Sequence, residues 1–184
     1  MSQYAVFTRL LAWLSLVVFV VACGKASPIE HHEGTTVYTQ IGMWVEGNAH
    51  NTTNYSQGVH IPINTRVEIQ DSNPEAIVFY IPDMDERVRL VNARQYTKLD
   101  IKGIFDRYFG TEQVSLDGFN RSTRQAIERG QVEIGMSKEA VLLARGYPPA
   151  HETPSTDHDI WTYWRHRFGR QLVHFENGRV NKIE

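Results

Sequence analysis

The sequence predicts an α+β fold: a β-rich N-terminal unit, followed by a unit of two helices packed on a three-stranded antiparallel sheet. Short runs in which apolar and polar residues alternate dominate residues 35–92, as in half-buried strands. Apolar residues then recur at helical spacing between residues 100 and 146, and strand-like runs close the chain. Helices followed by a strand and a hairpin favour a helical layer on one face of a small sheet.

Composition excludes several classes of protein. The 184 residues are 41% hydrophobic and 22% charged with a net charge of -2, which is typical of a globular chain. The balance of 19 basic and 21 acidic residues argues against nucleic-acid binding, which normally needs a basic face. A single cysteine excludes an internal disulfide.

The N-terminus predicts export. Residues 10–22 form an apolar run in which only Ser15 is polar. The run is too short for a comfortable transmembrane helix, and its length is that of a signal-peptide core. We therefore expect residues 1–22 to be a signal peptide.

The end of this run predicts lipid attachment. Val20-Val21-Ala22-Cys23 resembles a bacterial lipobox, in which the cysteine is lipidated and becomes the mature N-terminus. Cys23 is therefore the expected lipidation site, and residues 23–34 are the expected tether. Gly24, by resemblance to enterobacterial lipoproteins, favours anchoring in the outer membrane with the folded part facing the periplasm.

Residues 35–120 are predicted to form the β-rich unit with one helix. Strands are expected at residues 36–45, 59–63, 66–69, 76–81 and 87–92. The Asn- and Thr-rich stretch from Gly47 to Gly58 predicts a loop. A helix from about Asp100 is expected to bury one apolar face, and Thr97 with Asp100 predicts a capping box at its start.

Residues 121–184 are predicted to form the α/β unit. One helix is expected from Ser122 to Arg129, and a second is expected to be capped by Ser137 and ended by Gly146. Strands are expected at residues 160–165, 172–176 and 179–183. The last two flank Asn177-Gly178, which predicts a type I′ hairpin in which Glu176 faces Arg179 and His174 faces Asn181.

The order of motifs in this second unit is similar to that of a known family. Ile134-Gly135-Met136-Ser137 begins a helix, Gly146-Tyr147-Pro148 ends it, Trp161-Thr162-Tyr163-Trp164 opens the sheet and Phe175-Glu176-Asn177-Gly178-Arg179-Val180 closes it. The segment resembles the SmpA/OmlA (BamE-like) domain of Gram-negative outer-membrane lipoproteins. That resemblance implies a small α/β module that binds proteins, because the best-known member is a non-catalytic subunit in β-barrel assembly. The preceding β-rich unit departs from that pattern.

Three residues are candidates for contact with a partner. Strand alternation places Trp164 on the face opposite Trp161 and Tyr163, where either the first unit or a partner protein covers it. Tyr147 and His151 lie in a long Pro-rich loop, and such loops are often functional.

Five residues are candidates for ligand binding. They lie in or beside the polar stretch of the first unit, which has the composition of a glycan or peptidoglycan site and equally that of an ordinary turn. These residues are Trp44, His50, Asn51, Asn54 and Tyr55.

No catalytic residue, metal site or cofactor is expected. The histidines and carboxylates of residues 147–159 have neither a nucleophile beside them nor the spacing of metal ligands. The leading hypothesis is a non-catalytic lipoprotein that binds an envelope protein during outer-membrane protein assembly or envelope maintenance. The second is a peptidoglycan- or small-ligand-binding module, and the third is an enzyme of unrecognised type.

Overall fold

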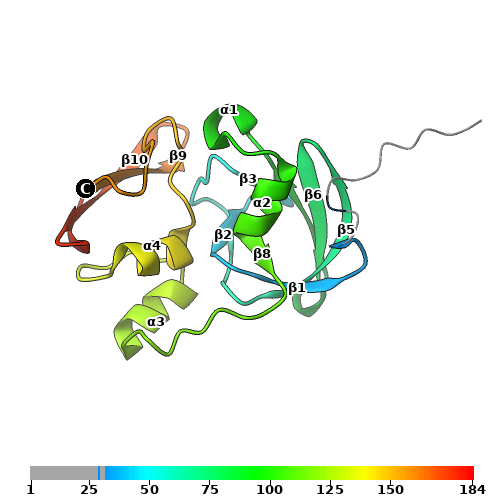
Figure 1. The fold of residues 1–184 in the computed structure, drawn as a ribbon, viewed down its shortest axis with the longest axis horizontal. Coiled ribbons are helices and arrows are strands. Elements are labelled where there is room, and N and C mark those ends of the chain that lie inside the picture. Colours follow the sequence, from blue (N-terminus) through cyan, green and yellow to red (C-terminus); the bar gives the residue numbers. More distant parts are fainter. Residues whose placement is uncertain (1–28, 30–31) are drawn as a thin grey trace, which may run out of the picture.

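The computed structural model describes Ile29 and residues 32–184, which form an α+β protein (Figure 1). The predicted signal peptide and the predicted lipidation site, Cys23, lie outside the described residues. Within the described part, no helix has the length and apolar composition of a membrane span. The elements are β1 (Thr36–Thr39), β2 (Met43–Val45), β3 (Ala49–Asn51), β4 (Val59–Ile61), β5 (Arg66–Asn73), β6 (Ala76–Ile81), the 3-10 helix η2 (Pro82–Met84), β7 (Glu86–Val91), α1 (Arg94–Thr97), α2 (Ile101–Tyr108), β8 (Phe109–Gly110), α3 (Arg121–Glu128), α4 (Lys138–Arg145), β9 (Ile160–His166), β10 (Gly169–Glu176) and β11 (Arg179–Ile183).

The N-terminal unit, which we define as the described residues up to Gly110, is built on a six-stranded sheet. Its strand order is β3-β7-β6-β5-β1-β8, and β2 pairs with β4 in a separate ladder. Helix α2 lies across this sheet (Figure 1) and contributes Ile101, Ile104, Phe105 and Tyr108 to the core. Ile29, within the predicted tether, is buried in the same core, so the packed unit includes the end of that segment.

The single strand predicted at residues 36–45 is wrong, because two strands with different partners occupy it. The predicted inward-facing residues are buried, and Val37 and Met43 fully so, but alternation stops at Gly42, which is buried as well. However, β1 pairs with β5 and β8, whereas β2 pairs with β4. An alternating pattern of apolar and polar residues predicts which side chains are buried. It does not predict which strands the backbone hydrogen bonds join.

The loop predicted at residues 47–58 is also partly wrong, since it contains β3. A tight turn at Gly47 and Asn48, both with positive φ, leads into β3, which pairs parallel to β7. Asn and Thr residues favour turns locally, but the partner of β3 lies about forty residues further along the chain, which is beyond the reach of local propensity.

Helix α2 begins as expected, although its cap differs from the predicted capping box. Asp100 is itself the N-cap, and its carboxylate accepts a hydrogen bond from the Gly103 amide at 2.8 Å. Thr97 instead ends α1 and donates its hydroxyl to Asn92 Oδ1.

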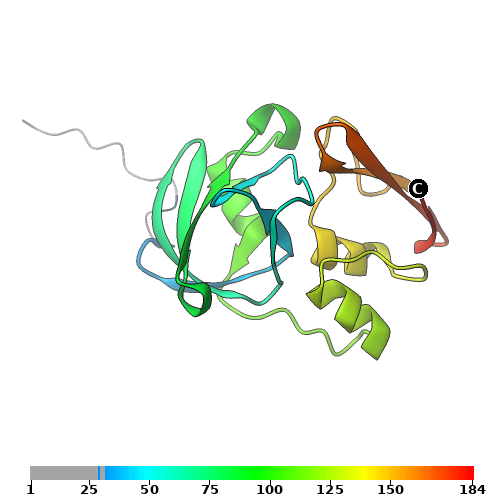
Figure 2. The ribbon, with the colours of Figure 1, turned by 180° about the vertical axis from the view of Figure 1, so that it is seen from behind.

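The C-terminal unit, which we define as residues 114–184, packs α3 and α4 on one face of the sheet β11-β10-β9 (Figure 2). Asn120 caps α3, so that helix begins one residue before the predicted start. Ser137 caps α4 and Gly146 follows its last residue, as predicted. The core between helices and sheet contains Trp161 and Tyr163, both fully buried.

The β10–β11 hairpin has the predicted turn and a register that differs beyond the first pair. Asn177 and Gly178 have φ values of 51° and 73°, and Glu176 lies opposite Arg179. His174 lies opposite Lys182, so its predicted pairing with Asn181 is wrong. A bulge between His174 and Phe175 adds one residue to β11.

Candidate functional site

The two units meet where the end of α4 contacts the N-terminal unit. The Gly42 amide donates to the Leu143 carbonyl at 2.8 Å. The buried Asn54 side chain donates from Nδ2 to the Arg145 carbonyl at 2.5 Å and to the Tyr147 carbonyl at 3.1 Å. These bonds satisfy the free carbonyls at the end of a helix, so α4 is fixed to the N-terminal unit.

Glycine at position 42 is required by this contact. A Cβ atom there would collide with the Ala144 carbonyl oxygen, which is backbone and cannot move aside cheaply. The break between β1 and β2 therefore places a residue without a side chain where the helix end approaches.

Among the predicted ligand-binding residues, His50 is internal. It is 1% exposed; its Nδ1 donates to the Trp44 carbonyl at 2.8 Å, and its Nε2 accepts from the Tyr108 hydroxyl at 3.1 Å. Burial lowers the pKa of His50 to about 4, so the ring is neutral near pH 7. Asn51, by contrast, is the exposed last residue of β3, and its side chain accepts from the Thr53 amide.

Tyr55, predicted to bind a ligand, and Trp164, predicted to face a partner, lie beside each other. Their ring centroids are 6.4 Å apart, and the Ser56 amide donates to the Trp164 carbonyl at 3.1 Å. The Arg170 guanidinium lies 5.6 Å from the Trp164 ring centroid. Trp164 is half-buried, so both the first unit and solvent reach it.

Tyr147 and His151 lie on the loop that joins α4 to β9. The Arg107 guanidinium stacks 3.8 Å from the Tyr147 ring centroid, and His151 packs on Tyr96 at 4.3 Å between centroids. Glu152, next to His151, lies 3.4 Å from Arg170. The loop therefore links α1 and α2 to the outer face of β10.

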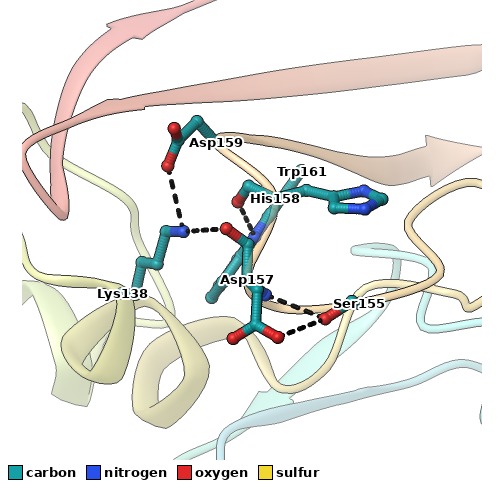
Figure 3. Close-up of polar contacts among 6 residues, drawn as sticks. All are labelled: Lys138, Ser155, Asp157, His158, Asp159 and Trp161. Atoms are coloured by element: carbon teal, nitrogen blue, oxygen red, sulfur yellow. Dashed lines mark hydrogen bonds and ion pairs between the residues drawn. The ribbon is translucent and has the colours of Figure 1, made fainter.

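The acidic end of this loop is fixed to α4 (Figure 3). Lys138 donates to the Asp157 carbonyl at 2.9 Å and to Asp159 Oδ1 at 3.1 Å, while the His158 carbonyl accepts from Trp161 Nε1. The His158 ring points away from Lys138 (Figure 3). Within residues 29 and 32–184, no three or more His, Cys, Asp or Glu side chains gather as a metal-binding group.

An exposed aromatic residue that the sequence analysis missed lies in the turn between β9 and β10. Phe168 is 85% exposed, with the Arg167 guanidinium 5.4 Å from its ring centroid. Residues 160–171 contain three arginines and no acidic residue, and this pattern around a phenylalanine in a turn was visible in the sequence. We call Tyr55, Trp164, Phe168 and Arg170 the β9–β10 surface.

A pocket of about 430 Å³ opens between the two units, and we call it the junction pocket. Trp44 and Ser56 line it from the N-terminal unit, and Arg145, Arg165 and Gln171 line it from the C-terminal unit. Of these five residues, only Trp44 was predicted to bind a ligand. Helix and strand periodicity does not predict which residues of two different units contact each other.

Arg145 is the unusual residue of the junction pocket. It is 4% exposed, its guanidinium carbon lies 5.1 Å from the Tyr163 ring centroid, and its Nε and Nη2 atoms have no hydrogen-bond partner. Burial and the nearby Arg165 lower the pKa of Arg145. Burial and the Arg145 charge also lower the pKa of His60 to about 4, and its buried Nε2 has no partner.

No protein-family model matches the chain, and comparison with curated proteins and with solved structures finds no significant match. The family resemblance of residues 121–184 therefore stays a prediction.

Proposed function

We propose that this chain is an outer-membrane lipoprotein that acts without catalysis, by binding a protein partner in outer-membrane protein assembly or envelope maintenance. The lipobox-like sequence ending in Cys23 supports a lipid anchor on the periplasmic side of the membrane. The motif order of residues 121–184, which resembles that of SmpA/OmlA (BamE-like) domains, supports a role in envelope assembly.

The β9–β10 surface is the observation that carries this proposal. Phe168 is 85% exposed, and Trp164 and Arg170 lie on the face of the sheet opposite the helices. Tyr, Trp, Phe and Arg are the residues enriched in protein interfaces and at their energetic centres. The cluster therefore has the composition of a binding site for a protein.

The shape of the molecule supports the same proposal. The described N-terminal residues and the three-stranded sheet lie toward opposite ends of the long axis (Figures 1 and 2). A chain held at Cys23 would then carry the three-stranded sheet on the side of its folded part away from the anchor.

The second candidate function is the binding of peptidoglycan or a small ligand. The polar residues predicted for that role do not form one site, because the side chains of His50 and Asn54 make hydrogen bonds inside the protein. The junction pocket favours this candidate instead, since its volume is within the range of small-ligand sites, about 300–1,000 Å³.

Photo-crosslinking in living cells tests the proposed function. The full chain is produced with a photoreactive phenylalanine in place of Phe168 and, as a matched control, in place of Ile134, which is 63% exposed in the same unit. We expect position 168 to give an adduct with an outer-membrane assembly protein and position 134 to give none. We also expect Cys23→Ala to release the protein from membranes and abolish the adduct.

The same experiment can contradict the proposal. An absence of adducts at position 168, or identical adducts from both positions, would remove the β9–β10 surface as a specific binding site. A Cys23→Ala protein that still fractionates as an integral membrane protein would contradict the lipid anchor.

A further inference from the structure

We propose that the junction pocket binds a carboxylate group, held by the guanidinium groups of Arg145 and Arg165. This inference goes beyond the proposed function, because it concerns different side chains from those of the β9–β10 surface. It also differs from the predicted site around Asn51, whose side chain is exposed at the end of β3 and does not line this pocket.

The geometry of Arg145 points to an anion. Nε and Nη2 lie on one edge of the guanidinium, the edge that forms two parallel hydrogen bonds with a carboxylate. Both atoms are buried and neither has a partner. A buried charge without a counter-charge strongly destabilises a folded protein. A bound anion would supply both the counter-charge and the missing hydrogen bonds of Arg145.

No acidic side chain of the pocket neutralises Arg145. Glu133 is the one acidic residue among those lining the pocket. Its carboxylate accepts from the Ser122 hydroxyl at 3.1 Å and lies 3.9 Å from Arg129, so it is engaged on the α3 side. The two arginines of the pocket therefore face it with an excess of positive charge.

Further donors surround the same space. Trp44 Nε1 is buried and has no partner, while Gln131 and Gln171 add side-chain amides to the wall. His60, packed against Trp44 at 4.9 Å between centroids, is neutral near pH 7 and adds no charge. The pocket is thus rich in hydrogen-bond donors as well as positive.

Charge balance favours a carboxylate over a phosphate dianion. Two arginines and one glutamate give the pocket a net charge of one positive unit. A single carboxylate neutralises this charge, whereas a dianion would leave an excess negative charge partly removed from water. The carboxylate can belong to a free small acid or to the C-terminus of a short peptide, and the pocket has room for either.

Titration by NMR tests this proposal on the folded protein. The probes are butyrate, N-acetyl-dialanine with a free carboxylate, the same dipeptide as its C-terminal amide, and inorganic phosphate. The signals followed are the indole N–H of Trp44 and the Nε–H of Arg145. We expect at least one carboxylate probe to shift both signals with saturation, and the amide to shift neither.

Substitutions connect the binding to the two arginines. We expect Arg145→Lys, which keeps the charge but loses the two-donor edge, to weaken binding at least tenfold, and Arg165→Gln to weaken it several-fold. Arg167→Gln, an exposed arginine outside the pocket, should leave binding unchanged. Glu133→Gln should strengthen it. If Arg145→Lys fails to fold, the affinities of Arg165→Gln and Glu133→Gln for the carboxylate probes still test the proposal.

Each outcome has a clear reading. Saturation by butyrate supports a free acid as the source, and saturation by the dipeptide but not by butyrate supports a peptide terminus. No saturable binding of either probe, equal binding of the amide, preference for phosphate, or indifference to the Arg165 and Glu133 substitutions overturns the proposal. Retention of carboxylate binding in Trp164→Ala would show that this site is independent of the β9–β10 surface.

Discussion

His50 joins β3 to α2 from inside the N-terminal unit. Its ring donates to the Trp44 carbonyl and accepts from the Tyr108 hydroxyl, which fixes the neutral tautomer with hydrogen on Nδ1. Protonation of Nε2 would place a charge in the core, removed from water. The pKa of His50 therefore falls from its ordinary value of 6.5 to about 4.

This depression makes stability depend on pH. Between pH 6.5 and 4 the unfolded chain binds a proton at His50 and the folded chain does not, so the free energy of unfolding falls as the pH is lowered. The full effect is on the order of 3 kcal/mol. His60 acts in the same direction.

Urea unfolding at pH 7.5 and pH 4.5 checks this prediction. We expect the native protein to lose stability at the lower pH, and His50→Gln to lose less between the two pH values although it is less stable at pH 7.5. His166→Gln, at an exposed histidine, should behave like the native protein. Equal pH dependence of native protein and His50→Gln would contradict the neutral buried ring.

The sequence predicted ligand-binding roles for Trp44, His50, Asn51, Asn54 and Tyr55, and the structure gives these residues different surroundings. Trp44 lines the junction pocket, and Tyr55 lies beside Trp164. His50 and Asn54, however, serve internal hydrogen bonds. Composition cannot distinguish a polar group that binds a ligand from one that satisfies a buried backbone.

The β10–β11 hairpin shows what local signals can specify at the scale of an element. Asn177 and Gly178 both adopt positive φ, as a type I′ turn requires. Space around Gly178 is open, so a side chain there would be strained by the backbone conformation and not by a collision.

We therefore expect Gly178→Val to destabilise the protein by about 1 kcal/mol or more, because a β-branched residue is poorly accommodated at positive φ. In thermal unfolding this corresponds to a decrease in melting temperature of about 2–4 °C. Gly118→Val is the matched control, since Gly118 also has open space around it and no positive φ. Equal melting temperatures for both variants would mean that the turn is not type I′.

Elements with local signals were predictable, and elements that depend on distant partners were not. Ser137 and Gly146 delimit α4 through a cap and a stop that adjacent residues provide. β3, by contrast, exists because it pairs with β7, and the segment at residues 36–45 divides because its two halves pair with different strands. Neither strand pairing can be predicted from the alternation of apolar and polar residues within the segment itself.

At the scale of the whole molecule, the α+β class followed from the sequence. The contact between the units did not, because it depends on Gly42 and Asn54 reaching the end of α4. The junction pocket and the β9–β10 surface both include residues from each unit. We infer that binding to a partner depends on the two units remaining together.

Partner capture by a Trp164→Ala variant of the full-length lipoprotein tests the central claim most directly. Capture of the envelope partner by native protein, Trp164→Ala and Gly178→Val is compared, with thermal unfolding measured on each. Gly178→Val, at the opposite end of β10, controls for lost stability. We predict that Trp164→Ala weakens capture by about 2 kcal/mol, roughly thirtyfold, and that Gly178→Val retains it. Undiminished capture by Trp164→Ala, or equal loss in both variants, would contradict the account.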